Sequence, residues 1–369
     1  MSVLHRAITF ICALALVGAA LPAFAGPPDA PPGHINSGRC LDKTDDAIPL
    51  TLQVNGEPAT GHYALPDEAP EALVVFAHGY GHSSYSWINH MQRTARDLGA
   101  IAVGMDYRGL KFVGDENKDG LPDTRGWNAM KGAEDLKAAA EYFESACKTV
   151  KRIVLLGVSM GGNMSGLALA LSRQTADNPL FDHWIDVEGA VNVIETYAGA
   201  RMLAPVNGFA KNAQQDIEAE MGGPIEEDPQ PYRERAVVTR IDDIKASGVK
   251  GVTVIHGVDD GLVPYNQGRE MASLLLQAGI PTDMFTVGRR SKQSEKETTA
   301  SGYIGDPLFG AAGQKYTSPF AGHASEKSTT HIIMVTAFER LAEVAKGYQP
   351  ALYNEYLVDG ELGTFGPTL

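Results

Sequence analysis

The sequence predicts one α/β domain, built on a mostly parallel sheet with helices on both faces. Ala72–Ala77 is a continuous apolar run, which is typical of a strand buried on both faces, and Arg152–Gly157 is interpreted in the same way. Gly126–Ala146 has strong helical periodicity. Strands and helices alternate in this manner along most of the chain, and such an order favours a parallel sheet.

The other expected elements follow the same alternation. Ile48–Val54 and Thr60–Leu65 are predicted to form an antiparallel hairpin that turns at Asn55-Gly56. The remaining predicted strands are Ile101–Tyr107, Trp184–Val191, Gly251–His256 and Asp283–Val287, and the remaining helices are Ser86–Leu98, Gly162–Ser172, Asn266–Ala278 and Thr330–Lys346. The tail Gln349–Leu369 has few periodic residues, so we expect it to pack over the domain.

The N-terminus predicts an export signal. Arg6 supplies a positive charge, Ile8–Leu21 is apolar, and Ala23-Phe24-Ala25 is a small-x-small cleavage site. The apolar run is short for a membrane anchor, so no membrane span is expected. We divide the chain into a signal peptide (1–25), an arm (26–47) and one α/β domain (48–369) with a cap insertion at about 195–235. The protein is expected to be secreted or periplasmic after cleavage near Ala25.

Composition restricts the partners. The chain has 369 residues, 44% of them hydrophobic, and a formal net charge of −14. Such an acidic protein repels nucleic acid and anionic membranes, so neither is expected as a partner. Cys40 and Cys147 remain after Cys12 leaves with the signal, and in an oxidising compartment they are a candidate disulfide, the alternative being two buried thiols.

The strongest motif is G-V-S-M-G at 157–161, between a predicted strand and a helix of small residues. A serine at such a sharp strand-to-helix turn is lifted above the sheet, and only small residues two positions away avoid collision across the turn. The helix N-terminus beyond it favours developing negative charge. This context predicts that Ser159 is a nucleophile rather than part of a chance glycine-rich turn.

A serine nucleophile needs a base and an orienting carboxylate. The segment H-G-V-D-D-G-L-V-P at 256–264 follows a strand, and either Asp259 or Asp260 can serve as the acid; Asp260 is preferred by its position in the turn. Two histidines qualify as the base. His323 lies in a small-residue loop before the last helix, whereas His331 lies at that helix's first turn, and we favour the loop histidine.

An oxyanion hole needs two backbone N–H groups about 3 Å from the developing charge. Met160, directly after the nucleophile, is one candidate donor. Tyr80 is the other, in H-G-Y-G at 78–81 after the strand Ala72–Ala77. His78 is interpreted as a structural residue of that loop.

Together these motifs resemble the α/β-hydrolase superfamily, and more narrowly its secreted lipase, esterase and prolyl-oligopeptidase-like members. The resemblance extends over about Ile48 to Gly347 and rests on residues 78–81, 157–161, 256–264 and 322–323. It implies an eight-stranded, mostly parallel sheet, a Ser-His-Asp triad and no required cofactor.

The loop D-E-N-K-D-G at 115–120 resembles the start of a calcium loop. The resemblance predicts that a structural calcium ion is bound by Asp115, Asn117, Asp119 and Asp123. The bidentate glutamate expected at loop position twelve is missing, since Gly126 stands there. A solvated acidic turn is the alternative reading.

The expected reaction is hydrolysis of a small carboxylic ester through an acyl-enzyme, as in carboxylesterases and lipases. A peptidase acting on short peptides is the alternative enzyme, and a non-catalytic binding protein on the same scaffold is the alternative from another class. Candidate pocket residues are Tyr85 and Trp87 near the oxyanion loop and Met202 and Phe209 in the cap, although each is also compatible with ordinary core packing.

Overall fold

A computed structural model describes residues 47–115, 120–172, 175, 177–288, 321–329, 331–358 and 366–367. In this part of the chain a ten-stranded sheet forms the centre, in the order β1-β2-β4-β3-β7-β8-β9-β10-β11-β12. Its strands are β1 (Ile48–Val54), β2 (Glu57–Ala64), β3 (Ala72–Ala77), β4 (Ile101–Met105), β7 (Arg152–Val158), β8 (His183–Val187), β9 (Gly251–Gly257), β10 (Thr282–Val287), β11 (Tyr353–Val358) and β12 (Gly366–Pro367). The seven strands from β4 to β11 in this order pair in parallel, so the predicted fold class is confirmed.

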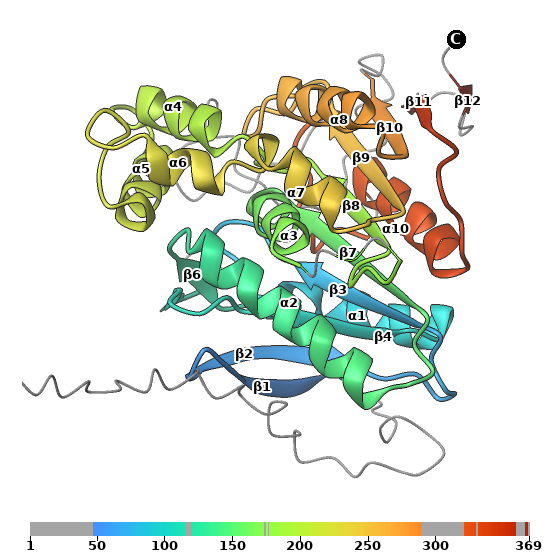
Figure 1. Ribbon diagram of the computed structural model, residues 1–369. Coiled ribbons are helices and arrows are strands. Elements are labelled where there is room, and N and C mark those ends of the chain that lie inside the picture. The colour runs from blue at the N-terminus through green and yellow to red at the C-terminus, as the bar shows by residue number, and fades with distance from the viewer. Residues whose placement is uncertain are drawn as a thin grey trace, which may run out of the picture.

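Helices cover both faces of the sheet (Figure 1). One face carries α1 (Ile88–Leu98) and α10 (Ile332–Ala345), and the other carries α2 (Ala129–Ala146), α3 (Met160–Ala170), α7 (Ile241–Ala246) and α8 (Asn266–Ala278). Two separate cores result. In β3, for example, Leu73 and Val75 belong to the core under α2 and α3, whereas Val74 and Phe76 belong to the core under α1 and α10.

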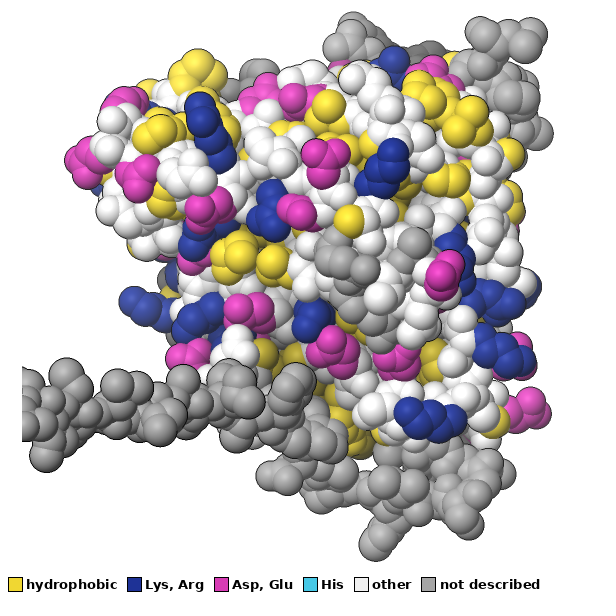
Figure 2. All heavy atoms as spheres, in the orientation of Figure 1, with side chains coloured by type: hydrophobic (Ala, Val, Ile, Leu, Met, Phe, Trp, Pro, Cys, Tyr) yellow, Lys and Arg dark blue, Asp and Glu magenta, His cyan; other side chains and the backbone are white. Residues whose placement is uncertain are grey.

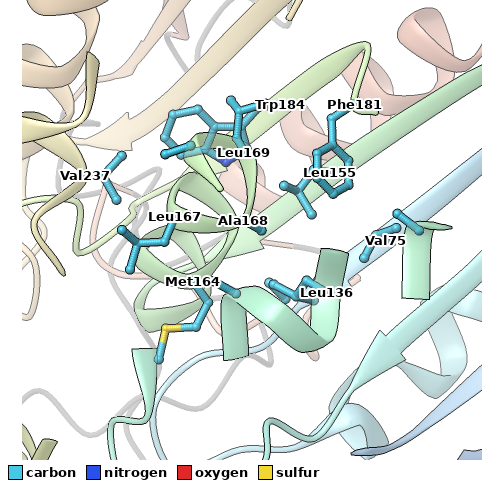
Figure 3. Close-up of a cluster of buried hydrophobic side chains, with 14 of the residues drawn as sticks. Val75, Leu136, Leu155, Met164, Leu167, Ala168, Leu169, Phe181, Trp184 and Val237 are labelled. Atoms are coloured by element: carbon cyan, nitrogen blue, oxygen red, sulfur yellow. The ribbon is translucent and has the colours of Figure 1, made fainter. Parts of the chain in front are cut away.

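The core beneath the candidate nucleophile is dense. Figure 3 shows Met164, Leu167 and Ala168 of α3 beside Leu136 of α2 and Leu155 of β7, with Trp184 of β8 next to them. Their side chains are fully buried. Each large apolar side chain buried in this way contributes about 1.5–3 kcal/mol to stability, so the position of α3 relative to β7 is firmly fixed.

Of the helices that lie between β8 and β9, three project from the sheet at the upper left of Figure 1. They are α4 (Val193–Leu203), α5 (Gly208–Met221) and α6 (Gln230–Arg235), and they occupy the region where the sequence interrupts the strand–helix alternation. A short hairpin of β5 (Lys111–Gly114) and β6 (Asp123–Arg125) lies below them.

The structure corrects the sequence predictions in three places. The sheet has ten strands rather than eight, because β11 and β12 of the tail pair onto the edge that β10 would otherwise expose. The strand predicted at Trp184–Val191 ends at Val187, and Glu188 turns away from it with a φ of 49°. The hairpin of β5 and β6 was not expected, because its strands are only four and three residues long.

Several predictions lie outside the described residues: the export signal, the arm up to residue 46, and Cys40. Cys147 is a buried residue directly after α2, and its disulfide stays a prediction.

Among the described residues, the helices are too short or too polar to cross a membrane. In Figure 2 acidic and basic side chains are mixed over the visible face rather than gathered by sign.

Gly161 is the residue on which the packing of α3 against β3 depends. A Cβ added there would lie 2.1 Å from the carbonyl oxygen of Ala77 and 2.8 Å from that of His78, and backbone atoms cannot move aside as a side chain can. We expect Gly161→Ala to destabilise the fold by about 1–3 kcal/mol or more in urea titrations. Gly199→Ala in α4 is the matched control, since nothing lies within 4 Å of its added Cβ; it should stabilise by up to about 1 kcal/mol. Equal effects of the two substitutions would contradict this explanation.

Candidate active site

Ser159 lies at the tip of a strained turn between β7 and α3. Its φ of 58° and ψ of −123° fall in a region that non-glycine residues rarely adopt. A Cβ on Gly157 would lie 2.2 Å from the carbonyl oxygen of Gly161, so the two glycines permit the turn. The half-buried Ser159 is thereby held in the geometry expected of a nucleophile elbow.

Backbone hydrogen bonds lock this turn to the end of β8. The N–H of Ser159 donates to the carbonyl of Val187 at 3.0 Å, and its own carbonyl accepts from Ala190 at 2.9 Å. The turn that begins with Glu188 and the serine turn therefore support each other.

The predicted acid and base lie together. His323 Nδ1 is 2.6 Å from Asp260 Oδ2, and both residues are buried. The other oxygen of Asp260 accepts the backbone N–H groups of Leu262 and Val263 at 2.8 and 2.9 Å. Asp260 is thus oriented by its own turn and faces the loop histidine, as preferred from the sequence.

The alternatives for acid and base are placed elsewhere. The backbone N–H of Asp259 donates to Ala321 at 2.9 Å, which ties the acid turn to the histidine loop. His331 is the N-cap of α10, where its Nδ1 accepts the N–H of Ile333 at 3.3 Å. This histidine therefore stabilises a helix end.

A second histidine also approaches Asp260. His256, at the end of β9, has its Nε2 2.9 Å from the carbonyl oxygen of Val263 and 3.3 Å from Asp260 Oδ2. Burial alone would raise the pKa of Asp260, but the charges and hydrogen bonds of His323 and His256 outweigh burial and hold that pKa below its ordinary value. Asp260 is therefore the ionised carboxylate of the site.

The loop after β3 lies against the nucleophile. A Cβ added to Gly79 would lie 3.4 Å from Ser159 Cβ, at van der Waals contact, so the loop packs directly against the nucleophile turn. Tyr80 follows in the same loop, and Met160 is the first residue of α3. The two candidate oxyanion donors therefore come from the two segments that border Ser159. His78 is buried, stacks on Tyr107 at 4.0 Å and accordingly has a structural position.

Two glutamates that the sequence analysis missed brace these segments. Glu188 accepts the N–H groups of Gly257 and Ala324 at 3.2 and 2.6 Å. Glu326 accepts the N–H of Gly79 at 3.1 Å and contacts His82 Nδ1 at 2.6 Å. Burial opposes ionisation of Glu326, but His82 lowers its pKa to about 2. Both glutamates join elements far apart in the sequence, and no local pattern marks them.

The predicted pocket residues need correction. Trp87 is fully buried and stacks on Phe76 at 4.7 Å, so it belongs to the core under α1 and does not line the site. Tyr85 packs edge-on against His62 at 4.4 Å. Phe209 of α5 does approach the site, with its ring 5.4 Å from that of Tyr80. Met202 is 74% exposed on α4.

Among the described residues, one cluster brings together side chains of the kind that bind metal ions. Glu188, Asp260 and His323 offer ligand atoms within 4.8 Å of one another, and these atoms already have partners: both oxygens of Glu188 and Oδ1 of Asp260 accept backbone N–H groups, and Asp260 Oδ2 contacts His323 Nδ1. In the predicted calcium loop, Asp115 accepts the N–H of Gly120 at 3.0 Å and Asp123 is buried. Asn117 and Asp119 lie outside the described residues, so calcium stays a prediction.

The cap is attached to the oxyanion loop through one carboxylate. Asp216 of α5 accepts the hydroxyl of Tyr80 at 2.5 Å, the Nε of Arg125 at 2.9 Å and the N–H of Gly126 at 3.1 Å. The contact of Phe209 with Tyr80 lies on the same helix. Cap position and the loop that carries Tyr80 are therefore coupled.

The family follows from a comparison with known proteins. The model of the prolyl oligopeptidase family matches residues 84–291, more than half of the chain. The chain belongs to the prolyl oligopeptidase family. The matched segment includes Ser159 and Asp260 and ends before His323, which the structure nevertheless brings to Asp260. No curated protein matches the sequence.

Three solved structures are similar to this chain. A puromycin-hydrolyzing peptidase of Mycobacterium tuberculosis is 15% identical with a TM-score of 0.51, over 84% of this chain and 41% of that one. An acylaminoacyl peptidase of Pyrococcus horikoshii is 19% identical with a TM-score of 0.48, over 66% and 37%. An esterase of Pyrococcus furiosus is 15% identical with a TM-score of 0.47, over 81% and 89%.

The chain thus spans about two fifths of the length of these two peptidases. At such identities, the likeness shows only the fold. Together with the family match, it identifies an α/β-hydrolase serine hydrolase.

The Asp216 contacts predict a functional role for the cap. Asp216→Ala removes the acceptor of three donors, so we expect a several-fold to about tenfold rise in KM for an ester substrate, as the cap separates from Tyr80. Glu220→Ala is the matched control, because it breaks the 2.7 Å pair with Arg235 inside the cap and leaves Tyr80 untouched. The same rise in KM for both variants would refute the coupling.

Asp186 of β8 predicts a pH-dependent stability. It is fully buried, and no described group hydrogen-bonds to either of its carboxylate oxygens; burial raises its pKa to about 7. The folded state therefore keeps a proton that the unfolded chain releases above about pH 4. Stability should fall as the pH rises from about 4 to about 7, with this group contributing at most about 1.4 kcal/mol per pH unit.

Urea titrations of the wild type and Asp186→Asn across that range test this expectation. The decline should be shallower in the variant, because its side chain does not titrate. The exposed Asp177→Asn is the control. Parallel profiles for the wild type and Asp186→Asn would exclude Asp186 as the source.

Proposed function

We propose that the protein hydrolyses carboxylic esters through an acyl-enzyme on Ser159. The observation that carries this proposal is the contact of His323 with Asp260 at 2.6 Å, because Asp260 follows β9 and Ser159 follows β7, so both lie at the carboxyl ends of parallel strands. A nucleophile, a base and an orienting acid are the three groups that acyl transfer by a serine requires.

Each group has one task in the proposed reaction. His323 takes the hydroxyl proton of Ser159 as the oxygen attacks the carbonyl carbon, and the buried charge of Asp260 stabilises the imidazolium. The N–H groups of Tyr80 and Met160 hold the oxyanion. His323 then gives the proton to the departing alkoxide, and water repeats the sequence to release the acid.

The cap side of the site favours an apolar acyl group. Phe209 is 45% exposed and rests on Tyr80, and Met202 and Val206 are 74% and 85% exposed on the neighbouring part of the cap. Arg125, the cation at this position, is already paired with Asp216. An ester also needs less protonation of its leaving group than an amide does, which favours ester substrates.

The second candidate is a peptidase or amidase with the same three residues. It is supported by the family match, because the family is named for an oligopeptidase and two of the similar structures are peptidases. Amide hydrolysis would use the same acyl-enzyme, with His323 protonating an amine.

We further propose that the protein is exported and that the loop at 115–123 holds a structural calcium.

The central test is covalent labelling with a fluorophosphonate. The wild type should be labelled and Ser159→Ala should not. His323→Ala should lose about 10⁶-fold in kcat, since the members of a triad act as a unit. His331→Ala should retain turnover and lose about 1 kcal/mol of stability, because it is a helix cap.

An unlabelled wild type would overturn the enzymatic reading in favour of a binding protein, and an inactive but folded His331→Ala would reverse the choice of base. Nitrophenyl esters of varied chain length, assayed beside proline anilides, decide between the two substrate classes. Faster cleavage of the anilides would replace the esterase proposal by the peptidase.

A further inference from the structure

Glu188 lies where a buried acid is costly, directly behind the histidine loop. It is fully buried at the first position after β8, with a φ of 49° that non-glycine residues rarely adopt. Its backbone N–H donates to Ile255 of β9 at 2.8 Å. The strained backbone and the buried carboxylate together indicate a position selected for its side chain.

Its two oxygens connect the segments that carry the acid and the base. Oε1 accepts the N–H of Gly257, three residues before Asp260, and Oε2 accepts the N–H of Ala324, directly after His323. A Cβ on Gly257 would lie 3.0 Å from Glu188 Oε1 and 2.2 Å from the carbonyl oxygen of Ala321. Gly257, Glu188 and the segment that begins at Ala321 therefore lie so close together that a side chain at position 257 would not fit.

The same carboxylate also faces the histidine ring. Glu188 Oε2 lies 3.7 Å from His323 Nδ1, the atom that Asp260 Oδ2 contacts at 2.6 Å. His323 thus has one carboxylate within hydrogen-bonding distance and a second about one ångström farther from the same nitrogen. In the described part of the chain, the titratable groups around Glu188 are Asp260 and His256 from the end of β9, Asp186 from β8, and His323.

The two carboxylates have pKa values shifted in opposite directions. Burial, and after it the charges of Asp260 and Asp186, raise the pKa of Glu188 well above its ordinary value, whereas the two histidines hold the pKa of Asp260 below its own. Removal of the Asp260 charge therefore removes one of the three causes that raise the pKa of Glu188.

We propose that Glu188 is a positioning residue of the triad, a second carboxylate that supports the His323 imidazolium when Asp260 is absent. In that state Glu188 ionises, its proton passes to solvent, and the ring or the side chain moves by about one ångström to close the contact. The inference rests on the proposed function, because it concerns the base of that reaction.

A double-mutant cycle on ester hydrolysis tests this proposal. Asp260→Asn should retain measurable turnover above the Ser159→Ala level, and its activity should rise with pH as Glu188 ionises. Glu188→Gln should cost about tenfold more in the Asp260→Asn background than in the wild type, because the two acids act on one nitrogen. The pH-dependent rise should vanish in the double variant.

Glu326→Gln is the matched control. It too removes a buried glutamate bonded to a backbone N–H, but its partners are Gly79 and His82. Its cost should be the same in both backgrounds. Additive effects at Glu188, or an Asp260→Asn variant at the Ser159→Ala level at every pH, would overturn the inference.

Two further measurements keep the test decisive. If Glu188→Gln does not fold, Glu188→Asp replaces it. This variant keeps the acid but shortens its side chain by one methylene group. In the Asp260→Asn background, Glu188→Asp should therefore reduce the rise of activity with pH. Fluorophosphonate labelling of the wild type reports on Ser159 alone. A labelled, active wild type with an additive cycle contradicts only the role of Glu188, whereas an unlabelled wild type contradicts the proposed function.

Discussion

The candidate site depends on how the segment 321–329 is held over the carboxyl ends of the strands. Three buried carboxylates hold it: Asp260 contacts His323, Glu188 accepts from Ala324, and Glu326, within the segment, binds Gly79 and His82. Hydrogen bonds to ionised groups are stronger than those between neutral groups. The charged Asp260 and Glu326 therefore position the base and the oxyanion loop, and Glu188, whose pKa is raised, adds a hydrogen bond to the same segment.

This arrangement places acids where water cannot reach them. Asp186, Glu188 and Asp260 are all buried near the ends of β8 and β9. Burial raises the pKa of the first two, whereas the two histidines lower that of the third. Such a site costs stability, as functional sites often do. The apolar cores on both faces of the sheet offset that cost.

Backbone strain is concentrated in the same region. Ser159 and Glu188 both have positive φ, and each follows directly on a central strand. Strained positions of this kind cost about 1–3 kcal/mol each and persist only where their surroundings fix them. The close packing of α3 on β7 (Figure 3) and the hydrogen bond from Ser159 to Val187 supply that restraint.

The sequence by itself determined the fold class, and it singled out Ser159 as the candidate nucleophile with a short list of candidate partners. These follow from local rules: apolar strands buried on both faces, and glycines two residues from a turn serine. The cap region at 195–235 was also visible, because it interrupts the alternation of strands and helices. A strand in the tail was not visible, since β11 is a half-exposed edge strand without a continuous apolar run.

Only the tertiary structure distinguishes the candidates Asp260 and His323 from Asp259 and His331, because the contact between Asp260 and His323 joins residues 63 positions apart. The same holds for Glu188 and Glu326, which reach partners 136 and 247 residues away and look like ordinary charged residues in the sequence. Trp87 was misplaced for a related reason: an aromatic residue near a site in sequence can face the opposite side of the sheet. Local sterics single out the candidate nucleophile, whereas long-range hydrogen bonds single out the candidate residues that would activate it.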